Sequence, residues 1–172
     1  MRKKLLMSEL LEIADKAGLS KSDFSRETFY RAQLYKTIIW VLALLFCNGK
    51  KECENENTEY NLDEKGNVKE ISLALSFKKR KMKRFVKFVS KNQKCLPSDL
   101  KKSFRLDAGI CDHYGDGGLV IYPRKIRYLK PVEYQELYED TEGSLTDEII
   151  NRDAYKKLRI IRDELLILLK GN

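Results

Sequence analysis

Apolar residues recur at helical spacing along the first part of the chain. An amphipathic helix is expected over residues 3–17, with one apolar face formed by Leu6, Leu10, Ile13, Ala14 and Ala17. Gly18 is expected to end this helix, because glycine takes the left-handed conformation of a C-terminal cap at little cost. A longer helix is expected over residues 23–47. Its second half, residues 38–46, is apolar on every face, which is typical of a helix buried on all sides.

The pattern changes twice in the middle of the chain. Residues 50–70 contain seven acids and predict an acidic hairpin arm or linker, whereas residues 71–77 alternate large apolar with small side chains. A period of two predicts a strand with one buried face. Residues 78–94 return to helical spacing and predict a basic amphipathic helix with an apolar face of Met82, Phe85, Val86 and Val89. Further short strands are expected near residues 103–111, 118–122 and 125–129.

The chain ends in a helical pattern. A short helix over residues 132–140 precedes a longer one over residues 145–169, where apolar residues repeat at alternating spacings of four and three: Ala154, Leu158, Ile161, Leu165 and Leu168. Such a seam packs either against residues 38–46 of the same chain, which is the favoured interpretation, or against a second copy in a homodimer.

Together these elements predict an α+β fold in a single domain over residues 1–172. Its helical core consists of the long buried helix 23–47 and the C-terminal helix 145–169. A small antiparallel sheet and the basic amphipathic helix 78–94 complete the fold. By composition, the chain divides into an N-terminal helical portion, an acidic hairpin or linker, and an α+β portion: residues 1–49, 50–70 and 71–172.

Charge is distributed unevenly along the chain. The sequence has 34 basic and 26 acidic residues and a net charge of +8, yet residues 77–105 alone hold twelve bases and one acid. On a helix, five of these bases share one stripe opposite the apolar face: Arg80, Arg84, Lys87, Lys91 and Lys94. A stripe of this kind contacts a phosphate backbone by matching charge and releasing counterions. A solvated surface and an anionic membrane are the alternatives.

The sequence therefore predicts a nucleic-acid-binding face. The residues expected to contact phosphate are Lys79, Arg80, Lys83, Arg84, Lys87, Lys91, Lys94, Lys101, Lys102, Arg105, Arg124 and Arg127. Phe88 and Tyr128 offer rings on which the bases of a single strand can stack, although Phe88 fits the apolar core equally well. Both RNA and DNA fit this pattern, because stacking residues and phosphate-binding residues serve both.

Residues 13–26 carry a second signal for DNA. Ala14, Gly18 and Phe24 place a small residue, a glycine four positions later, and an apolar residue six positions after the glycine. This stretch of 14 residues resembles the helix-turn-helix of LacI-type and related bacterial repressors. There the small residue lets two helices cross closely and the glycine permits the turn. The resemblance implies that DNA is read by Ser20, Lys21, Ser22, Ser25 and Arg26.

A cluster further along the chain is a candidate for catalysis. Four residues surround a glycine-rich turn: Asp107, Asp112, His113 and Asp116. Carboxylates with an imidazole can hold a divalent metal that activates water for phosphodiester cleavage. The favoured interpretation is an ordinary hairpin turn, for which Asp and Gly are common residues, without metal or cofactor. Zinc bound by Cys95, Cys111 and His113 is a weaker alternative, because their spacing is unusual for zinc.

The location expected from the sequence is the cytoplasm. The four cysteines show no CxxC spacing and no disulfide framework, so they are expected to be reduced. The N-terminal segment is basic, but acids interrupt the apolar run that a secretory signal needs. The longest uncharged run, residues 37–49, is too short to cross a bilayer, so no membrane partner is expected.

These observations favour one function and leave two others open. The favoured one is a non-enzymatic regulatory or accessory protein of bacterial or phage type that binds the phosphate backbone of RNA or DNA. The first alternative is a protein-binding inhibitor or accessory subunit that docks on a nucleoprotein complex, as small anti-defence proteins of phages do. The second alternative is a metal-dependent nuclease built on the cluster at residues 107–116.

Overall fold

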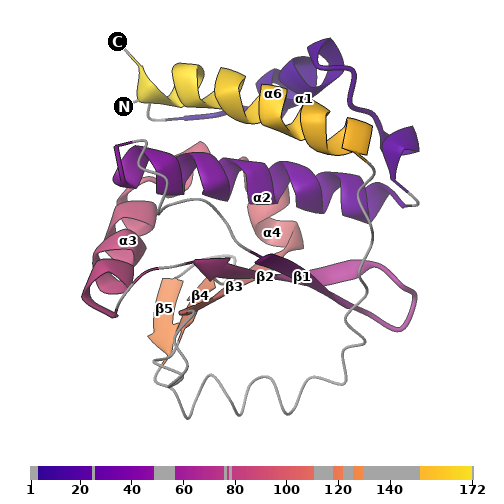
Figure 1. Cartoon of the computed structure of the whole chain (residues 1–172). Coiled ribbons are helices and arrows are strands. Elements are labelled where there is room, and N and C mark those ends of the chain that lie inside the picture. The colour runs from indigo at the N-terminus through magenta and orange to yellow at the C-terminus, as the bar shows by residue number, and fades with distance from the viewer. Residues whose placement is uncertain are drawn as a thin grey trace.

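Helix α2 (Glu27–Phe46) lies at the centre of the protein, between two outer helices and a sheet (Figure 1). The computed structural model describes residues 4–24, 26–48, 57–75, 77, 79–110, 118–121, 126–129 and 152–171. The other described helices are α1 (Met7–Lys16), η1 (Lys21–Asp23), α3 (Lys79–Lys91), η3 (Gln93–Cys95), α4 (Ser98–Ser103) and α6 (Arg152–Lys170), of which η1 and η3 are single 3-10 turns. The described strands are β1 (Asn57–Leu62), β2 (Val68–Leu75), β3 (Arg105–Ile110), β4 (Gly118–Ile121) and β5 (Ile126–Leu129).

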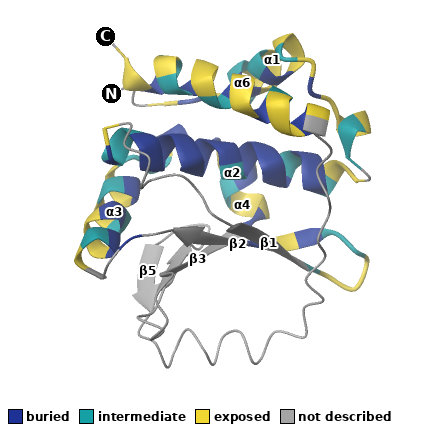
Figure 2. Ribbon diagram, viewed as in Figure 1, coloured by how far each residue is buried: buried dark blue, intermediate teal, exposed yellow. Residues whose placement is uncertain are grey.

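Helix α2 is buried along most of its length, as Figure 2 shows. Its apolar residues point in every direction around the axis, so each side must pack against another part of the protein. Ile38, Ile39 and Leu42 have no exposed surface at all. The expected helical core is therefore confirmed, although α2 begins at Glu27 rather than at residue 23.

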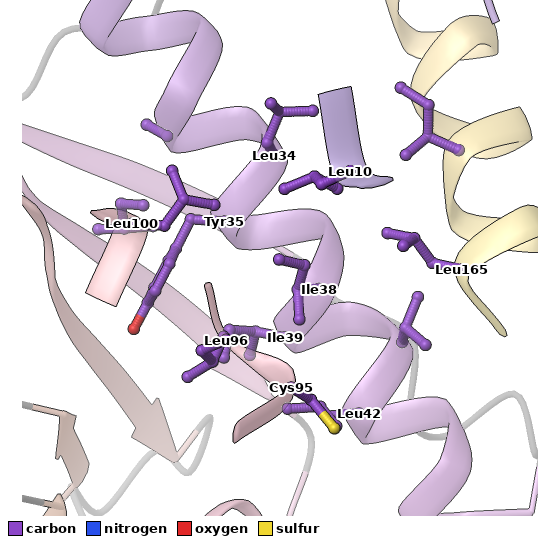
Figure 3. Packing of buried hydrophobic residues seen from close by; sticks show 14 of the residues in the cluster. Leu10, Leu34, Tyr35, Ile38, Ile39, Leu42, Cys95, Leu96, Leu100 and Leu165 are labelled. Atoms are coloured by element: carbon purple, nitrogen blue, oxygen red, sulfur yellow. The ribbon is translucent and has the colours of Figure 1, made fainter. Parts of the chain in front are cut away.

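Two sides of α2 carry different neighbours (Figure 3). On one side, Ile38 lies towards Leu10 of α1 and Leu165 of α6. On the other side, Tyr35 lies towards Leu100 of α4 and its ring centroid is 6.0 Å from that of Phe104. The core thus continues across α2, from the outer pair of helices to the layer beside the sheet.

The apolar seam of the C-terminal helix is buried within the chain. Its buried residues are at most 3% exposed: Ala154, Leu158, Ile161, Leu165 and Leu169. Leu169 takes the place that was expected for Leu168, which is only partly buried. Helix α6 packs along α2, with the Arg162 guanidinium 4.6 Å from the centroid of the Trp40 ring. Packing within the chain, the favoured interpretation of this seam, is confirmed, and the alternative of a homodimer stays a prediction.

Strands β1 and β2 form an antiparallel hairpin, in which Tyr60 pairs with Ile71. The Asp63 carboxylate shapes its turn by accepting the backbone N–H groups of Lys65 and Asn67, each at 2.9 Å. Gly66 completes the turn with a positive φ of 79°, a conformation that costs glycine little. The hairpin expected around the acidic segment is thus present in its described part.

The five described strands form one sheet in the order β1-β2-β3-β4-β5, and it is mixed. Strands β2 and β3 are parallel, with Ile71 paired to Leu106, whereas β3–β4 and β4–β5 are antiparallel. The expected antiparallel sheet is therefore wrong. The physical reason is the crossover between β2 and β3: α3, η3 and α4 return the chain to the same end of the sheet, which a parallel pair requires.

Several element boundaries differ from the expected ones. The basic helix ends at Lys91, earlier than residue 94, and Gln93–Cys95 form a separate 3-10 turn. Helix α4 was not expected at all, and the described part of the C-terminal helix begins at Arg152. The helix expected over residues 132–140 lies outside the described residues, as do residues 145–151.

The cysteines differ from one another. Cys95 is a fully buried thiol at the end of η3. Cys47, directly after α2, is disulfide-bonded, so the expectation that every cysteine is reduced is wrong. Disulfides are uncommon in a reducing cytosol, so this bond counts against the expected cytoplasmic location. That location stays a prediction.

Candidate nucleic-acid interface

Helix α3 has one apolar and one basic face. Met82, Phe85 and Val89 recur at helical spacing and have no exposed surface. The opposite face is exposed and carries five bases and one serine: Arg80, Lys83, Arg84, Lys87, Ser90 and Lys91. The sequence places these side chains outwards because apolar residues 82, 85 and 89 attach the other face to the core.

An aromatic cluster holds α3 against the end of α2. Phe46 of α2 lies with its ring centroid 5.4 Å from Phe85 and 5.6 Å from Phe88. Phe77, which precedes the helix, lies 5.3 Å from Phe85 in an edge-to-face arrangement. Such pairs contribute about 0.5–1.5 kcal/mol beyond the burial of their surface. Phe88 is thus part of the core packing, so its expected stacking role has no support here.

Four bases of the exposed face form what we call the α3 stripe: Arg80, Arg84, Lys87 and Lys91. The ion pairs between described residues lie elsewhere, at Glu12–Lys16, Lys21–Glu27, Asp23–Lys157 and Arg162–Asp163. Within the described part of the chain, no acid neutralises the stripe. Its first and last members are eleven residue steps apart along the helix, which is about 16 Å. That length matches about five nucleotide steps of about 3.4 Å each.

The remaining predicted phosphate contacts are only partly described. Lys94 and Lys102 are exposed, and the Lys101 ammonium donates a hydrogen bond to the Gln93 side-chain oxygen. The backbones of Lys79, Arg105 and Arg127 lie in α3, β3 and β5, but their side chains are outside the description. Arg124 lies outside the described residues altogether, and the same is true of the Tyr128 ring.

A groove that sequence reasoning missed lies at the C-terminal end of the stripe. Its volume is about 760 Å³, and it is lined by the N-terminal segment, the end of α3, η3 and the start of α4: Lys4, Leu5, Leu6, Met7, Ser90, Lys91, Gln93, Lys94, Leu96, Pro97, Ser98 and Lys101. Four of these residues are lysines and none is an acid. The Leu5 N–H donates to the Lys94 carbonyl at 3.2 Å, and this hydrogen bond joins the N-terminal segment to η3. Residues 89 positions apart meet there, and no local sequence pattern predicts such a contact.

The helix-turn-helix candidate has an extended connection between its helices. Gly18 has a φ of 79°, in the left-handed region expected of it. Helix α1 ends at Lys16 and α2 begins at Glu27, with the turn η1 between them, whereas a helix-turn-helix joins its helices by three or four residues. DNA reading by this segment stays a prediction.

The predicted DNA-reading side chains have contacts within the chain. Lys21 forms an ion pair with Glu27 at 2.9 Å. Arg26 donates a hydrogen bond to the Lys65 carbonyl at 2.6 Å and so ties the start of α2 to the β1–β2 turn. The Ser20 and Ser22 hydroxyls lie 2.7 Å apart, and Ser25 is outside the described residues.

The candidate metal cluster falls mostly outside the description. Asp112, His113, Asp116 and Cys111 are not described, and Asp107 is placed only as a backbone position in β3. Within the described ranges, no three His, Cys, Asp or Glu side chains gather closely enough to hold a metal ion. Nor does any helix in these ranges combine the length and apolar character needed to span a membrane.

Comparison of the chain with protein-family models, with curated proteins and with solved structures finds no match.

Proposed function

We propose that the protein is a non-enzymatic nucleic-acid-binding protein that grips the phosphate backbone with the α3 stripe. The observation that carries this proposal is the exposed row of Arg80, Arg84, Lys87 and Lys91, which has no acidic partner among the described residues. The aromatic cluster around Phe46 holds the row in place. Preorganised cations of this kind attract phosphates and release condensed counterions.

The energetic consequence is a strong dependence on salt. If each of the five exposed bases of α3 neutralises one phosphate of a duplex, the slope of log affinity against log salt concentration is near −4.5. Raising the salt concentration from about 50 to about 200 mM then lowers the affinity roughly 500-fold. For a single strand the slope is near −3.5 and the loss is roughly 130-fold.

The test is fluorescence anisotropy with labelled single-stranded RNA, single-stranded DNA and duplex DNA over this range of salt. Tight binding with a steep slope supports the proposal, and the preferred strand identifies the natural ligand class. Weak binding to all three at low salt overturns it. In that case tight co-purification with one protein would select the docking subunit, and cleavage in the presence of magnesium would select the nuclease.

A further inference from the structure

We propose that the groove beside α3 is the seat of one unstacked nucleotide in a single-stranded nucleic acid. Its lysines would hold the phosphates on either side of that nucleotide. This inference rests on the proposed function and adds to it a choice of ligand, namely a single strand in preference to a duplex.

The groove has the chemistry of a site for an anion with an apolar part. Its floor includes Leu5 and Leu96, which are only 2% and 3% exposed, together with the buried Pro97. Its cations are Lys4, Lys91, Lys94 and Lys101, and none of the described residues that line it is an acid. A nucleotide offers both features, because its base has apolar faces and its phosphates are charged.

The polar groups of the groove are mainly donors. The Lys101 ammonium can only donate, so the oxygen of the Gln93 amide faces it and the amide nitrogen keeps its two hydrogens for another partner. Ser90 and Ser98 add hydroxyl groups. Donors of this kind suit the carbonyl and ring-nitrogen acceptors on the edge of a base as well as phosphate oxygens.

Position links the groove to the proposed backbone contact. Lys91 belongs both to the α3 stripe and to the lining of the groove, so a strand that follows the stripe reaches the groove at its end. The volume of about 760 Å³ lies within the usual range for small-molecule sites. A duplex keeps its bases stacked, and extruding one costs a few kcal/mol, whereas a single strand offers unstacked bases directly.

The experiment compares three pairs of substitutions that each remove two positive charges from exposed lysines or arginines. Lys4→Gln/Lys94→Gln changes the groove, Arg84→Gln/Lys87→Gln changes the stripe, and the matched control Lys156→Gln/Lys170→Gln changes the outer surface of α6. None of these six side chains has an ion-pair partner among the described residues. Each full-length variant is titrated into labelled oligothymidine of about 12 nucleotides and into a duplex of similar length, at about 100 mM salt.

The groove pair is expected to weaken binding of the single strand about tenfold or more and binding of the duplex less than about threefold. The stripe pair should weaken both ligands to a similar degree, and the control pair should weaken neither by more than about threefold. A groove pair that affects both ligands equally, or no more than the control does, overturns the inference and leaves backbone binding by α3 intact. Failure of the wild-type protein to bind either ligand instead overturns the proposed function itself.

Photocrosslinking gives an independent readout of the same inference. Oligothymidine that carries one photoreactive thiothymidine is expected to crosslink to residues 4–7 or 90–98. Crosslinks confined to residues 80–87 would overturn the seat in the groove. Polyglutamate is tested as a competing kind of ligand. If Lys4→Gln/Lys94→Gln abolishes binding of polyglutamate and leaves binding of oligothymidine unchanged, the groove is a site for an acidic protein segment.

Discussion

The Lys157 ammonium lies 3.0 Å from the Asp23 carboxylate and joins α6 to the 3-10 turn before α2, across 134 positions of sequence. Both side chains are partly buried, with 30% and 16% of their surface exposed. Asp23 also accepts the backbone N–H of Ser20 at 2.8 Å. One carboxylate therefore caps the turn and fixes the last helix to the first part of the chain.

The first prediction concerns stability at low pH. The Ser20 N–H, and after it Lys157, hold the pKa of Asp23 below its ordinary value of 3.8, although burial acts in the opposite direction. A lowered pKa means that the carboxylate stabilises the fold fully above pH 4, and that this contribution is lost as the pH falls through the folded-state pKa. Asp23→Asn should lower the free energy of unfolding at pH 7 by about 1–2 kcal/mol.

Urea unfolding from pH 7 down to about pH 3 measures this effect. The difference between wild type and Asp23→Asn should shrink as the pH falls below 4. Lys157→Met serves as the matched variant, because it removes the ion pair but keeps the Ser20 hydrogen bond. A difference that stays constant with pH would contradict the role assigned to the Asp23 charge.

The second prediction concerns Lys36, a partly buried lysine in the middle of α2. Burial lowers the pKa of its ammonium from 10.5 to about 8. Between these pH values the unfolded chain binds more protons than the folded one, so the contribution of Lys36 to the free energy of unfolding rises with pH. Below pH 8 the folded protein bears the full cost of a desolvated ammonium. Lys36→Met should therefore be more stable than wild type at pH 7, by about 1–3 kcal/mol.

This gain should decline between pH 8 and about pH 10. Burial raises the pKa of Tyr30 and of Tyr35, and these groups add a pH dependence of their own near pH 10. The difference between the two proteins cancels that effect, because both contain the same tyrosines. Chemical unfolding at several pH values measures the difference, and a gain that does not change with pH would show that Lys36 is not desolvated.

The sequence predicts well the features that depend on neighbouring residues. The apolar run at 38–46 correctly indicated that α2 is a buried central helix. The left-handed conformation of Gly18 follows from its place after a helical pattern. The α3 stripe depends only on helical period, so its exposure could be foreseen. Helix α4 was missed because six residues are too few for a period to show.

Features formed by distant residues could not be predicted in this way. The parallel pairing of Ile71 with Leu106 depends on how α3 and α4 pack between the two strands. The groove depends on the contact of Leu5 with Lys94, which brings the N-terminal segment against η3. In both cases tertiary packing decides which segments come into contact, and neither segment carries a local sequence pattern that identifies its partner.

The third prediction tests the aromatic cluster that holds α3. Phe85→Ala removes a ring with no exposed surface that packs on Phe46 and Phe77. Loss of the buried ring and the resulting cavity should lower the free energy of unfolding by about 3–5 kcal/mol. Phe88→Ala should cost clearly less, because Phe88 is only partly buried. Urea unfolding followed by circular dichroism measures both, and equal costs would contradict the central position given to Phe85.

The fourth prediction separates charge on the stripe from charge elsewhere. Arg84→Glu/Lys87→Glu reverses two adjacent members of the exposed row, far from the buried face of α3. The fold should be retained, because surface substitutions of this kind change stability by less than about 0.5 kcal/mol. The control Lys156→Glu/Lys170→Glu changes the net charge equally on the outer surface of α6.

The stripe variant should bind nucleic acid at least about tenfold more weakly at low salt. The slope of its log affinity against log salt concentration should be less steep by about 2, because each lost phosphate contact removes nearly one unit. The control should keep the wild-type slope, because distant charges act through a field that salt screens within about 10 Å. Anisotropy titrations at several salt concentrations give both slopes. Equal losses for the two variants would mean that net charge, rather than the row on α3, attracts the polyanion. An unchanged affinity in the stripe variant would remove α3 as the binding face.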